Sequence, residues 1–377
     1  MRTLIIADPW DIHARAVAWG LEKAGHDSLV FYTHDFPQKT AISIRLGADG
    51  DGDGAASVEF ACARRGRPMT LEDADAVWLR RWYQPIVSPD LHQADAKFAQ
   101  TESGEFMRST MHMLDEHPRF WVNPLEAKLR ADRKPVQLAN AVAVGLRIPE
   151  TLFSNDPARI RAFFHDNGGR AIYKPLTAAT WVSDEKAHAT FTSVLTEDLL
   201  RHDASLANAP GIYQSFLEKD FELRVTVIGR TVFAARLESQ KEGYYLVDWR
   251  ANQLDNEIEC SVFVLPAHIE EKCCALMDRL GLVFGCIDIV VTPDGQYVFL
   301  EVNEMGQFIW LEDMNAGLPL LDCFVKFLIS RDPAYRYDST DPIGDFAEFR
   351  AWFEGQGEVE PDASRHVAIP RSYEMRE

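Results

Sequence analysis

The chain lacks long hydrophobic runs and the cysteine spacings typical of metal or disulfide sites. No apolar run approaches the ~18 residues that a membrane-spanning helix needs. No signal peptide is apparent either, so we expect a cytoplasmic protein without a membrane partner. The cysteines include no C-x-x-C pair, which favours reduced and mostly buried thiols. They are Cys62, Cys260, Cys273, Cys274, Cys286 and Cys323.

Basic charge is also scarce. The sequence has 39 Lys and Arg residues against 58 Asp and Glu residues, a formal net charge of −19. Nucleic-acid binding requires a basic surface, so this balance argues against a nucleic-acid partner. ATP remains possible, because a nucleotide needs only a few local cations and Mg²⁺. With 377 residues, 46% of them hydrophobic, the chain is long enough for two or three packed units.

Two further absences exclude common nucleotide and calcium sites. Thr3–Ala7, Asp11–Ala24 and Ser28–Tyr32 predict a strand, a helix and a second strand. No G-x-G-x-x-G follows the first strand, so a dinucleotide-binding domain is not predicted. The run GADGDGDG at Gly47–Gly54 matches the first half of an EF-hand loop, but Phe60 stands where the bidentate glutamate belongs. We interpret this run as a surface turn between strands.

The most informative stretch of the sequence contains a β-hairpin. Two runs rich in β-forming residues, Cys286–Thr292 and Gln296–Asn303, flank the turn signal Pro-Asp-Gly. A two-residue loop would place Asp288 directly opposite Glu301. A three-residue loop would make them diagonal neighbours, still within reach of each other. Either loop brings two carboxylates together.

The alternation of side chains along a strand predicts which residues join these carboxylates. Glu301 and Asn303 share a face, and the same alternation adds Tyr297 and Phe299 to it. Opposed carboxylates destabilise a sheet unless a cation lies between them. Two carboxylates and an amide oxygen form a ligand set that suits Mg²⁺. The alternative is a pair of acids on a solvated strand face.

The hairpin and the residues after it resemble a known family. Asp-x(12)-Glu-x-Asn on a closing hairpin resembles the metal-binding end of ATP-grasp carboxylate ligases. The continuation Asn-Glu-Met-Gly-Gln-Phe, with Trp310 and Glu312, resembles more specifically the ligases that macrocyclise graspetides, the microviridin-like ribosomal peptides. Glu304 replaces the usual proline in this motif, which leaves the ligand positions intact.

The resemblance implies an α/β (α+β) protein with an ATP-grasp fold behind an N-terminal pre-ATP-grasp α/β domain. It divides the chain into an N-terminal domain (1–124), a central subdomain (125–208), a C-terminal subdomain (209–335) and a C-terminal extension (336–377). We expect residues 363–377 to be loosely ordered.

The resemblance also implies roles for individual residues. The implied metal ligands are Asp288, Glu301 and Asn303, and the implied nucleotide-binding residues are Lys134, Lys174, Gln214, Phe216, Leu217 and Glu222. Arg224 is expected to face the phosphates, and Arg250 to contact phosphate or an acyl phosphate. Arg236 is our candidate for binding the reacting carboxylate. Surface ion pairing is the alternative for any one of these arginines. The segment Thr177–Thr180 lacks the glycines of the usual phosphate flap.

The implied activity is ATP- and Mg²⁺-dependent ligation. An Asp or Glu side chain of a ribosomal precursor peptide, with leader and core, would become an acyl phosphate and then an ester or amide. One alternative is a ligase, similar to RimK, that adds amino acids to a protein or a small carboxylate. Another is a nucleotide-binding regulator without ligase activity. Relatives suggest a homodimer.

Overall fold

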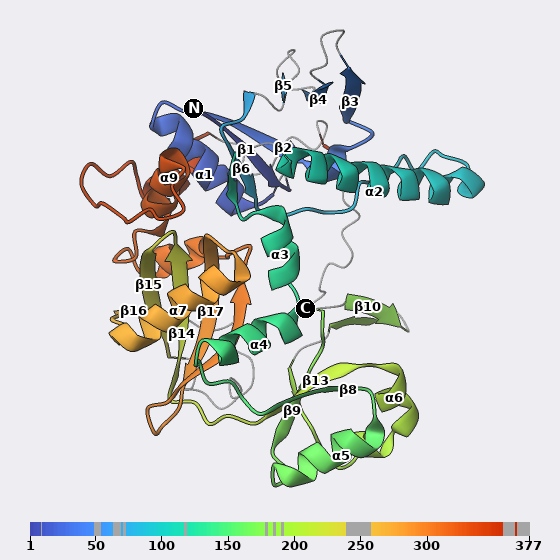
Figure 1. The fold of residues 1–377 in the computed structure, drawn as a ribbon, viewed down its shortest axis with the longest axis vertical. Coiled ribbons are helices and arrows are strands. Elements are labelled where there is room, and N and C mark those ends of the chain that lie inside the picture. The colour runs from blue at the N-terminus through green and yellow to red at the C-terminus, as the bar shows by residue number, and fades with distance from the viewer. Residues whose placement is uncertain are drawn as a thin grey trace.

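The computed structural model describes residues 1–8, 10–48, 54–62, 69–70, 73–116, 119–177, 180–183, 186–189, 192–238, 258–356 and 366–367. Figure 1 shows a parallel sheet at the top, a five-stranded sheet below it on the left, and a smaller sheet at the lower right. Both α/β and antiparallel β architecture are present, so the predicted α/β (α+β) class is confirmed.

The N-terminal sheet is parallel, with strand order β2-β1-β6-β7. The strands are β1 (Arg2–Ala7), β2 (Asp27–Tyr32), β6 (Ala76–Leu79) and β7 (Phe120–Val122). The helices α1 (Ile12–Lys23) and α2 (Gln93–Asp115) pack against opposite faces of this sheet. Asp11 caps α1 by accepting hydrogen bonds from the backbone amides of His13 and Ala14. The predicted β-α-β start is therefore confirmed.

A hairpin extends from this domain. It comprises β3 (Thr40–Ala48) and β4 (Gly54–Cys62), with β5 (Met69–Thr70) on the outer edge of β4. Residues 49–53 of the predicted turn lie outside the described residues, and Ala48 pairs with Gly54 on either side of them.

Two helices lead from the N-terminal domain to a smaller antiparallel sheet. They are α3 (Leu125–Ala131) and α4 (Lys134–Ala143). The sheet has the order β12-β9-β13-β8, from β8 (Thr151–Ser154), β9 (Ala171–Lys174), β12 (Ser193–Val194) and β13 (Gly211–Ser215). The helices α5 (Pro157–Asp166) and α6 (Asp203–Asn208) lie beside it, and β10 (Thr180–Ser183) pairs with β11 (Lys186–Ala189) as a separate hairpin (Figure 1).

The five-stranded sheet is antiparallel, with order β16-β15-β14-β17-β18. Its strands are β14 (Phe221–Ile228), β15 (Thr231–Leu237), β16 (Cys260–Phe263), β17 (Phe284–Val291) and β18 (Tyr297–Asn303). The helices α4 and α7 (Ala267–Leu280) cover one face with an apolar core. On the other face, α8 (Ile309–Met314) and α9 (Leu320–Ser330) cover the end near Phe284 and Cys286. The remainder of this second face carries Glu222, Arg224 and Asp288 together with Val290.

The C-terminal residues return to the N-terminal domain. In α10 (Phe346–Gly355), Phe349 packs against Trp19 of α1, with ring centroids 5.8 Å apart. His366 and Val367 are buried, and Asp35 accepts hydrogen bonds from His366 Nδ1 (2.8 Å) and the Val367 amide (2.9 Å). The prediction of loose order is therefore wrong for these two residues, because they pack at the carboxyl end of β2.

The structure also bears on the expectations about membranes and thiols. Within the described ranges, no helix combines the length and the apolar character needed to cross a membrane. The five cysteines whose side chains are described are free thiols.

Candidate active site

The predicted pair of opposed carboxylates is present. Asp288 in β17 lies directly opposite Glu301 in β18, and Cys286 lies opposite Asn303. Near the turn the register differs by one residue, because Ile289 pairs with Phe299. Leu300 is the extra residue of a β-bulge between the two registers. The hairpin therefore has the three-residue loop. The bulge restores the direct pairing of Asp288 with Glu301 that this loop alone would not give.

The bulge also corrects the predicted faces of β18. Tyr297 and Phe299 do not share a face with Glu301, because the bulge reverses the alternation between Phe299 and Glu301. Phe299 is fully buried in the apolar core beside Ile289, on the opposite face of the sheet. The extra residue leaves Glu301 and Asn303 as the polar pair.

Arg224 in β14 binds the first carboxylate. It pairs with Asp288 across the sheet, and its Nη1 donates to Asp288 Oδ1 at 2.7 Å. Its Nη2 donates to the carbonyl oxygen of Gln307 at 3.3 Å. Burial opposes the charge of this guanidinium, but the Asp288 carboxylate raises the pKa of Arg224 above its ordinary value. Arg224 is thus a fixed cation beside Asp288.

A second cation lies beside Glu301. Lys134 Nζ, at the start of α4, forms an ion pair with Glu301 Oε2. Asn303 Nδ2 donates to Asp288 Oδ2 at 3.1 Å, so all three predicted metal ligands belong to one cluster. Two carboxylates and one amide fit Mg²⁺, which is usually held by one or two carboxylates with water and phosphate oxygens completing its shell. Among the described residues, no group of three or more His, Cys, Asp and Glu forms an alternative metal site.

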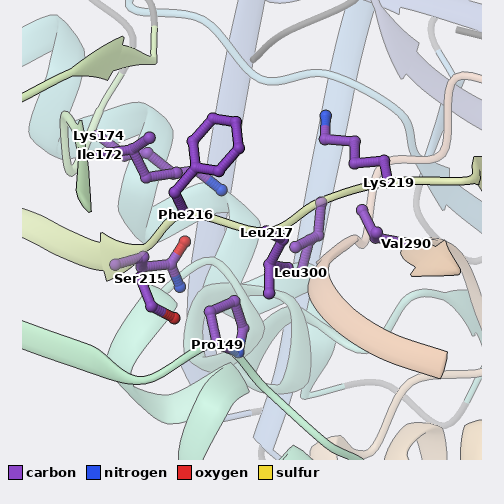
Figure 2. Close-up of a pocket in the computed structure, with 10 residues that line it drawn as sticks. Pro149, Ile172, Lys174, Ser215, Phe216, Leu217, Lys219, Val290 and Leu300 are labelled. Carbon is purple, nitrogen blue, oxygen red and sulfur yellow. The ribbon is translucent and has the colours of Figure 1, made fainter. Parts of the chain in front are cut away.

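A pocket lies between the two antiparallel sheets (Figure 2), and two of its lining residues, Val290 and Leu300, adjoin this cluster in sequence. The five-stranded sheet supplies Val290 and the bulge residue Leu300, while β9 supplies Ile172 and Lys174. The full lining is Pro149, Ile172, Lys174, Gln214, Ser215, Phe216, Leu217, Lys219, Val290 and Leu300. Four of the predicted nucleotide-binding residues, Lys174, Gln214, Phe216 and Leu217, therefore meet in one slot with largely apolar walls.

Two polar features of this pocket suit a nucleotide. Gln214 Nε2 donates to Thr151 Oγ1 at 3.1 Å, whereas its Oε1 is buried without a hydrogen-bond partner among the described residues. A buried acceptor of this kind fits an amino group such as that of adenine. At the other end, Lys219 Nζ and Glu222 Oε1 form a buried ion pair at 3.0 Å. Glu222 shares its sheet face with Arg224, because they are two residues apart on β14.

The structure does not bring every predicted residue together. Arg236 pairs with Leu223, whose side chain belongs to the apolar core of the opposite face. Its guanidinium lies over the ring of Phe221 at 3.8 Å and bonds Glu238 Oε1 at 2.6 Å. Arg236 therefore points away from the face that carries Arg224 and Asp288. Arg250 and residues 178–179 of the predicted flap lie outside the described residues.

Several site residues were missed from the sequence. Lys219 could have been found from its i, i+3 spacing to Glu222, but Leu300 depends on a bulge that has no sequence signal. Glu304, which replaces the usual proline, is buried and forms an ion pair with Lys128 Nζ at 2.8 Å. The replacement therefore adds a polar link between α3 and the segment after the metal ligands.

Comparisons with known proteins match the fold of this chain. The family model of the MvdD pre-ATP-grasp domain matches residues 4–128. A sequence comparison with curated proteins finds no match. The macrocyclase MdnC from Microcystis aeruginosa MRC, solved with its precursor peptide MdnA, is 26% identical with a TM-score of 0.75, over 88% of this chain and 100% of its own. The macrocyclase MdnB from the same organism is 28% identical with a TM-score of 0.70, over 87% and 99%.

A third solved structure contains a nucleotide. The RiPP-associated ATP-grasp ligase of Chryseobacterium gregarium, in complex with ADP and a leader and core peptide, is 27% identical with a TM-score of 0.76. The match covers 89% of this chain and 99% of that one. Residues 4–128 therefore match the MvdD pre-ATP-grasp domain, and most of the chain is similar to ATP-grasp ligases and to macrocyclases of ribosomal peptides.

Proposed function

We propose that this chain is an ATP-dependent ligase that closes macrocycles in a ribosomal precursor peptide. The observation that carries the proposal is the Asp288–Glu301–Asn303 cluster, whose neighbours Val290 and Leu300 line the slot between the two antiparallel sheets. The peptide substrate is supported by the similar proteins, which were solved with a precursor peptide or with a leader and core peptide.

ATP would lie in the slot between the two antiparallel sheets. The base would pack between Ile172 and the Val290–Leu300 wall, with its amino group donating to Gln214 Oε1. Phe216 and Leu217 would supply hinge contacts to the base, and Glu222 would meet the ribose. Lys174 and Lys134 would face the phosphates.

Asp288, Glu301 and Asn303 would hold Mg²⁺, which supplies positive charge against the phosphate oxygens. Arg224 holds Asp288 in place from the neighbouring strand and adds a second fixed positive charge. Lys134, which pairs with Glu301 here, would exchange this carboxylate for a phosphate oxygen when the nucleotide enters.

The reaction would then have two steps. A carboxylate oxygen of the peptide attacks the γ-phosphorus of ATP, the bond to the bridging oxygen breaks, and ADP leaves. A hydroxyl or amine of the same peptide attacks the resulting acyl carbon, loses its proton and displaces phosphate. Fixed cations stabilise the charge on the transferring phosphoryl group, and Arg250 remains a candidate for this role. No protein nucleophile is needed.

We propose that the four-part division of the chain, with boundaries near residues 124, 208 and 335, also applies. It is supported at the first boundary by the separate sheets on either side and at the third by the return of α10 to α1. At the second boundary β13 pairs with β8 and β9, so one sheet spans it. A homodimer in the cytoplasm also stays a prediction.

Nucleotide turnover tests the proposal against a silent regulator. The purified protein is mixed with Mg²⁺, ATP and the peptide encoded by the short reading frame beside its gene, and ADP release is followed. We expect ADP release that depends on the peptide, and loss of it when the carboxylates of the peptide are changed to amides. Nucleotide binding without peptide-dependent ADP release would favour the regulator.

A further inference from the structure

The segment between the metal ligands and α8, residues 304–308, is held by the N-terminal domain. Arg80, at the carboxyl end of β6, donates from Nη1 to the Met305 carbonyl at 3.3 Å. Asn123, at the carboxyl end of β7, donates from Nδ2 to the Glu304 carbonyl at 2.8 Å. The segment directly follows Asn303, so the parallel sheet helps to fix the backbone beside the proposed metal site.

His13 makes the contact at the end of this segment. It lies in the first turn of α1 and is buried. Its Nε2 accepts hydrogen bonds from two consecutive backbone amides, Phe308 at 3.1 Å and Ile309 at 3.3 Å. These amides lie where α8 begins, and the ring of Phe308 packs against the imidazole with centroids 5.3 Å apart. One side chain thus satisfies two buried donors at the start of a short helix.

The two amides bound to His13 Nε2 require a neutral ring with its proton on Nδ1. A backbone amide can only donate, so Nε2 must keep its lone pair. Nδ1 lies 3.6 Å from Asp11 Oδ1 and 3.4 Å from Arg80 Nη2, and this Nη2 lies 3.2 Å from Asp11 Oδ2. Burial lowers the pKa of His13 below its ordinary value, which favours the neutral form. Asp11 therefore orients both the imidazole and the arginine that hold the segment.

The held segment is connected to the metal ligands through Arg224. The Gln307 carbonyl, one residue before the amide bound by His13, accepts from Arg224 Nη2, and the same guanidinium binds Asp288. A shift of residues 307–309 would therefore remove one of the acceptors that fix Arg224. Groups behind metal ligands set the ligand geometry, and their loss costs about 10–100-fold in affinity or activity.

We propose that His13 is a positioning residue for the metal-binding end of the site, acting through residues 307–309 and Arg224 on Asp288. This inference rests on the proposed function of the Asp288–Glu301–Asn303 cluster. It assigns to the pre-ATP-grasp domain a direct part in shaping the site, in addition to its own fold.

Two substitutions separate positioning from packing. His13→Leu has a similar volume and no acceptor, whereas His13→Gln can present an oxygen to the amides of Phe308 and Ile309. His34→Leu is the matched control, because His34 is also buried in the N-terminal domain but accepts no bond from this segment; its Nδ1 lies 3.1 Å from the Gln84 carbonyl. Each variant is first compared with the wild type by urea unfolding.

The readouts are the binding of Mn²⁺ in the presence of ADP, followed by electron paramagnetic resonance, and peptide-dependent ADP release. We expect His13→Leu to weaken Mn²⁺ binding about tenfold and to lower turnover by at least about tenfold, with substantial recovery in His13→Gln. The His34→Leu variant should bind Mn²⁺ as the wild type does.

Two results would overturn the assignment of His13. One is Mn²⁺ binding by His13→Leu equal to that of the wild type. The other is a loss of Mn²⁺ binding that follows the unfolding free energy alone and is shared by His34→Leu. A wild-type protein that binds no Mn²⁺ with ADP would instead overturn the proposed metal site, so the two failures can be told apart.

Discussion

At the residue scale, each of the two opposed carboxylates is paired with a cation. Arg224 neutralises Asp288, and Lys134 neutralises Glu301. These pairs explain how a sheet tolerates acids directly opposite each other, which would otherwise repel. They also indicate which of the two carboxylates is free to change partner, because a lysine on a flexible stem moves more easily than a buried guanidinium.

Replacing Glu301 with glutamine tests its role as a metal ligand. We expect the Glu301→Gln variant to fold, because the side chain keeps its size and the repulsion is removed. Ligation should fall at least about 100-fold, because one anionic ligand of Mg²⁺ is lost. Glu348→Gln, a change at an exposed glutamate paired with Lys23, serves as the control. Near-normal turnover of the Glu301 variant at saturating Mg²⁺ would exclude this residue from the site.

Two arginine-to-lysine changes test which face of the sheet is active. Lysine cannot reproduce the two simultaneous bonds of Arg224 to Asp288 and Gln307, so Arg224→Lys should lower turnover about 10–100-fold. Arg236→Lys should stay within about threefold of the wild type, since Arg236 lies on the opposite face. The assay is initial-rate ADP release with peptide. A larger loss of turnover in Arg236→Lys than in Arg224→Lys would show that the active face of the sheet is not the one that carries Arg224.

Part of this arrangement of arginines and carboxylates could be predicted from the sequence. The turn at Gly229-Arg230 fixes Arg236 opposite Leu223, so alternation alone separates Arg236 from Arg224. The proximity of Asp288 and Glu301 also follows from the turn signal, because either loop length brings them within reach. The bulge at Leu300 does not, because an extra residue in a strand has no local sequence signal and is decided by packing.

At the element scale, Glu312 joins three helices rather than taking part in the chemistry. It is buried in α8 and accepts hydrogen bonds from the backbone amides of Leu321 in α9 (2.7 Å) and Phe346 in α10 (3.0 Å). In this chain Glu312 therefore ties α8 to α9 and α10. This role could not be predicted from the sequence, because α10 begins 34 residues later in the chain.

Burial raises the pKa of Glu312 to about 7, which predicts a pH-dependent stability. The folded protein holds this proton more tightly than the unfolded chain, so the stabilisation is complete below the ordinary pKa. It is lost as pH rises through about 7, by at most about 3 kcal/mol. Between pH 5 and pH 8 the unfolding free energy of the wild type should fall, and that of Glu312→Gln should fall less. Urea titration at each pH measures both. An unchanged pH profile would contradict the raised pKa.

At the scale of the whole molecule, the chain closes on itself. The C-terminal residues reach the carboxyl end of the N-terminal sheet, where Asp35 binds His366 and Val367. Strand and helix patterns predicted the β-α-β start and the hairpin, whereas the family resemblance implied the ATP-grasp fold and the division into units. The sequence could not predict this return, because a short polar segment gives no signal for the distant surface that it covers.

Asp35→Asn tests whether this return stabilises the fold. We expect a loss of about 1–2 kcal/mol in unfolding free energy, because a charged acceptor of two buried donors is replaced by a neutral amide. The midpoint of thermal unfolding should fall by about 2–4 °C for each kcal/mol of unfolding free energy lost. Deletion of residues 366–377 should give a similar loss, and the two changes together should be less than additive. Fully additive losses would show that Asp35 acts on something other than this segment.

The central claim is best tested by the mass of the peptide product. Enzyme, Mg²⁺, ATP and the peptide from the adjacent reading frame are incubated, and the peptide is followed by mass spectrometry, with Glu301→Gln as the inactive control. Each bond formed within the peptide eliminates one water, so we expect successive losses of about 18 Da. A gain in mass by whole amino acids would contradict macrocyclisation and favour an amino-acid ligase.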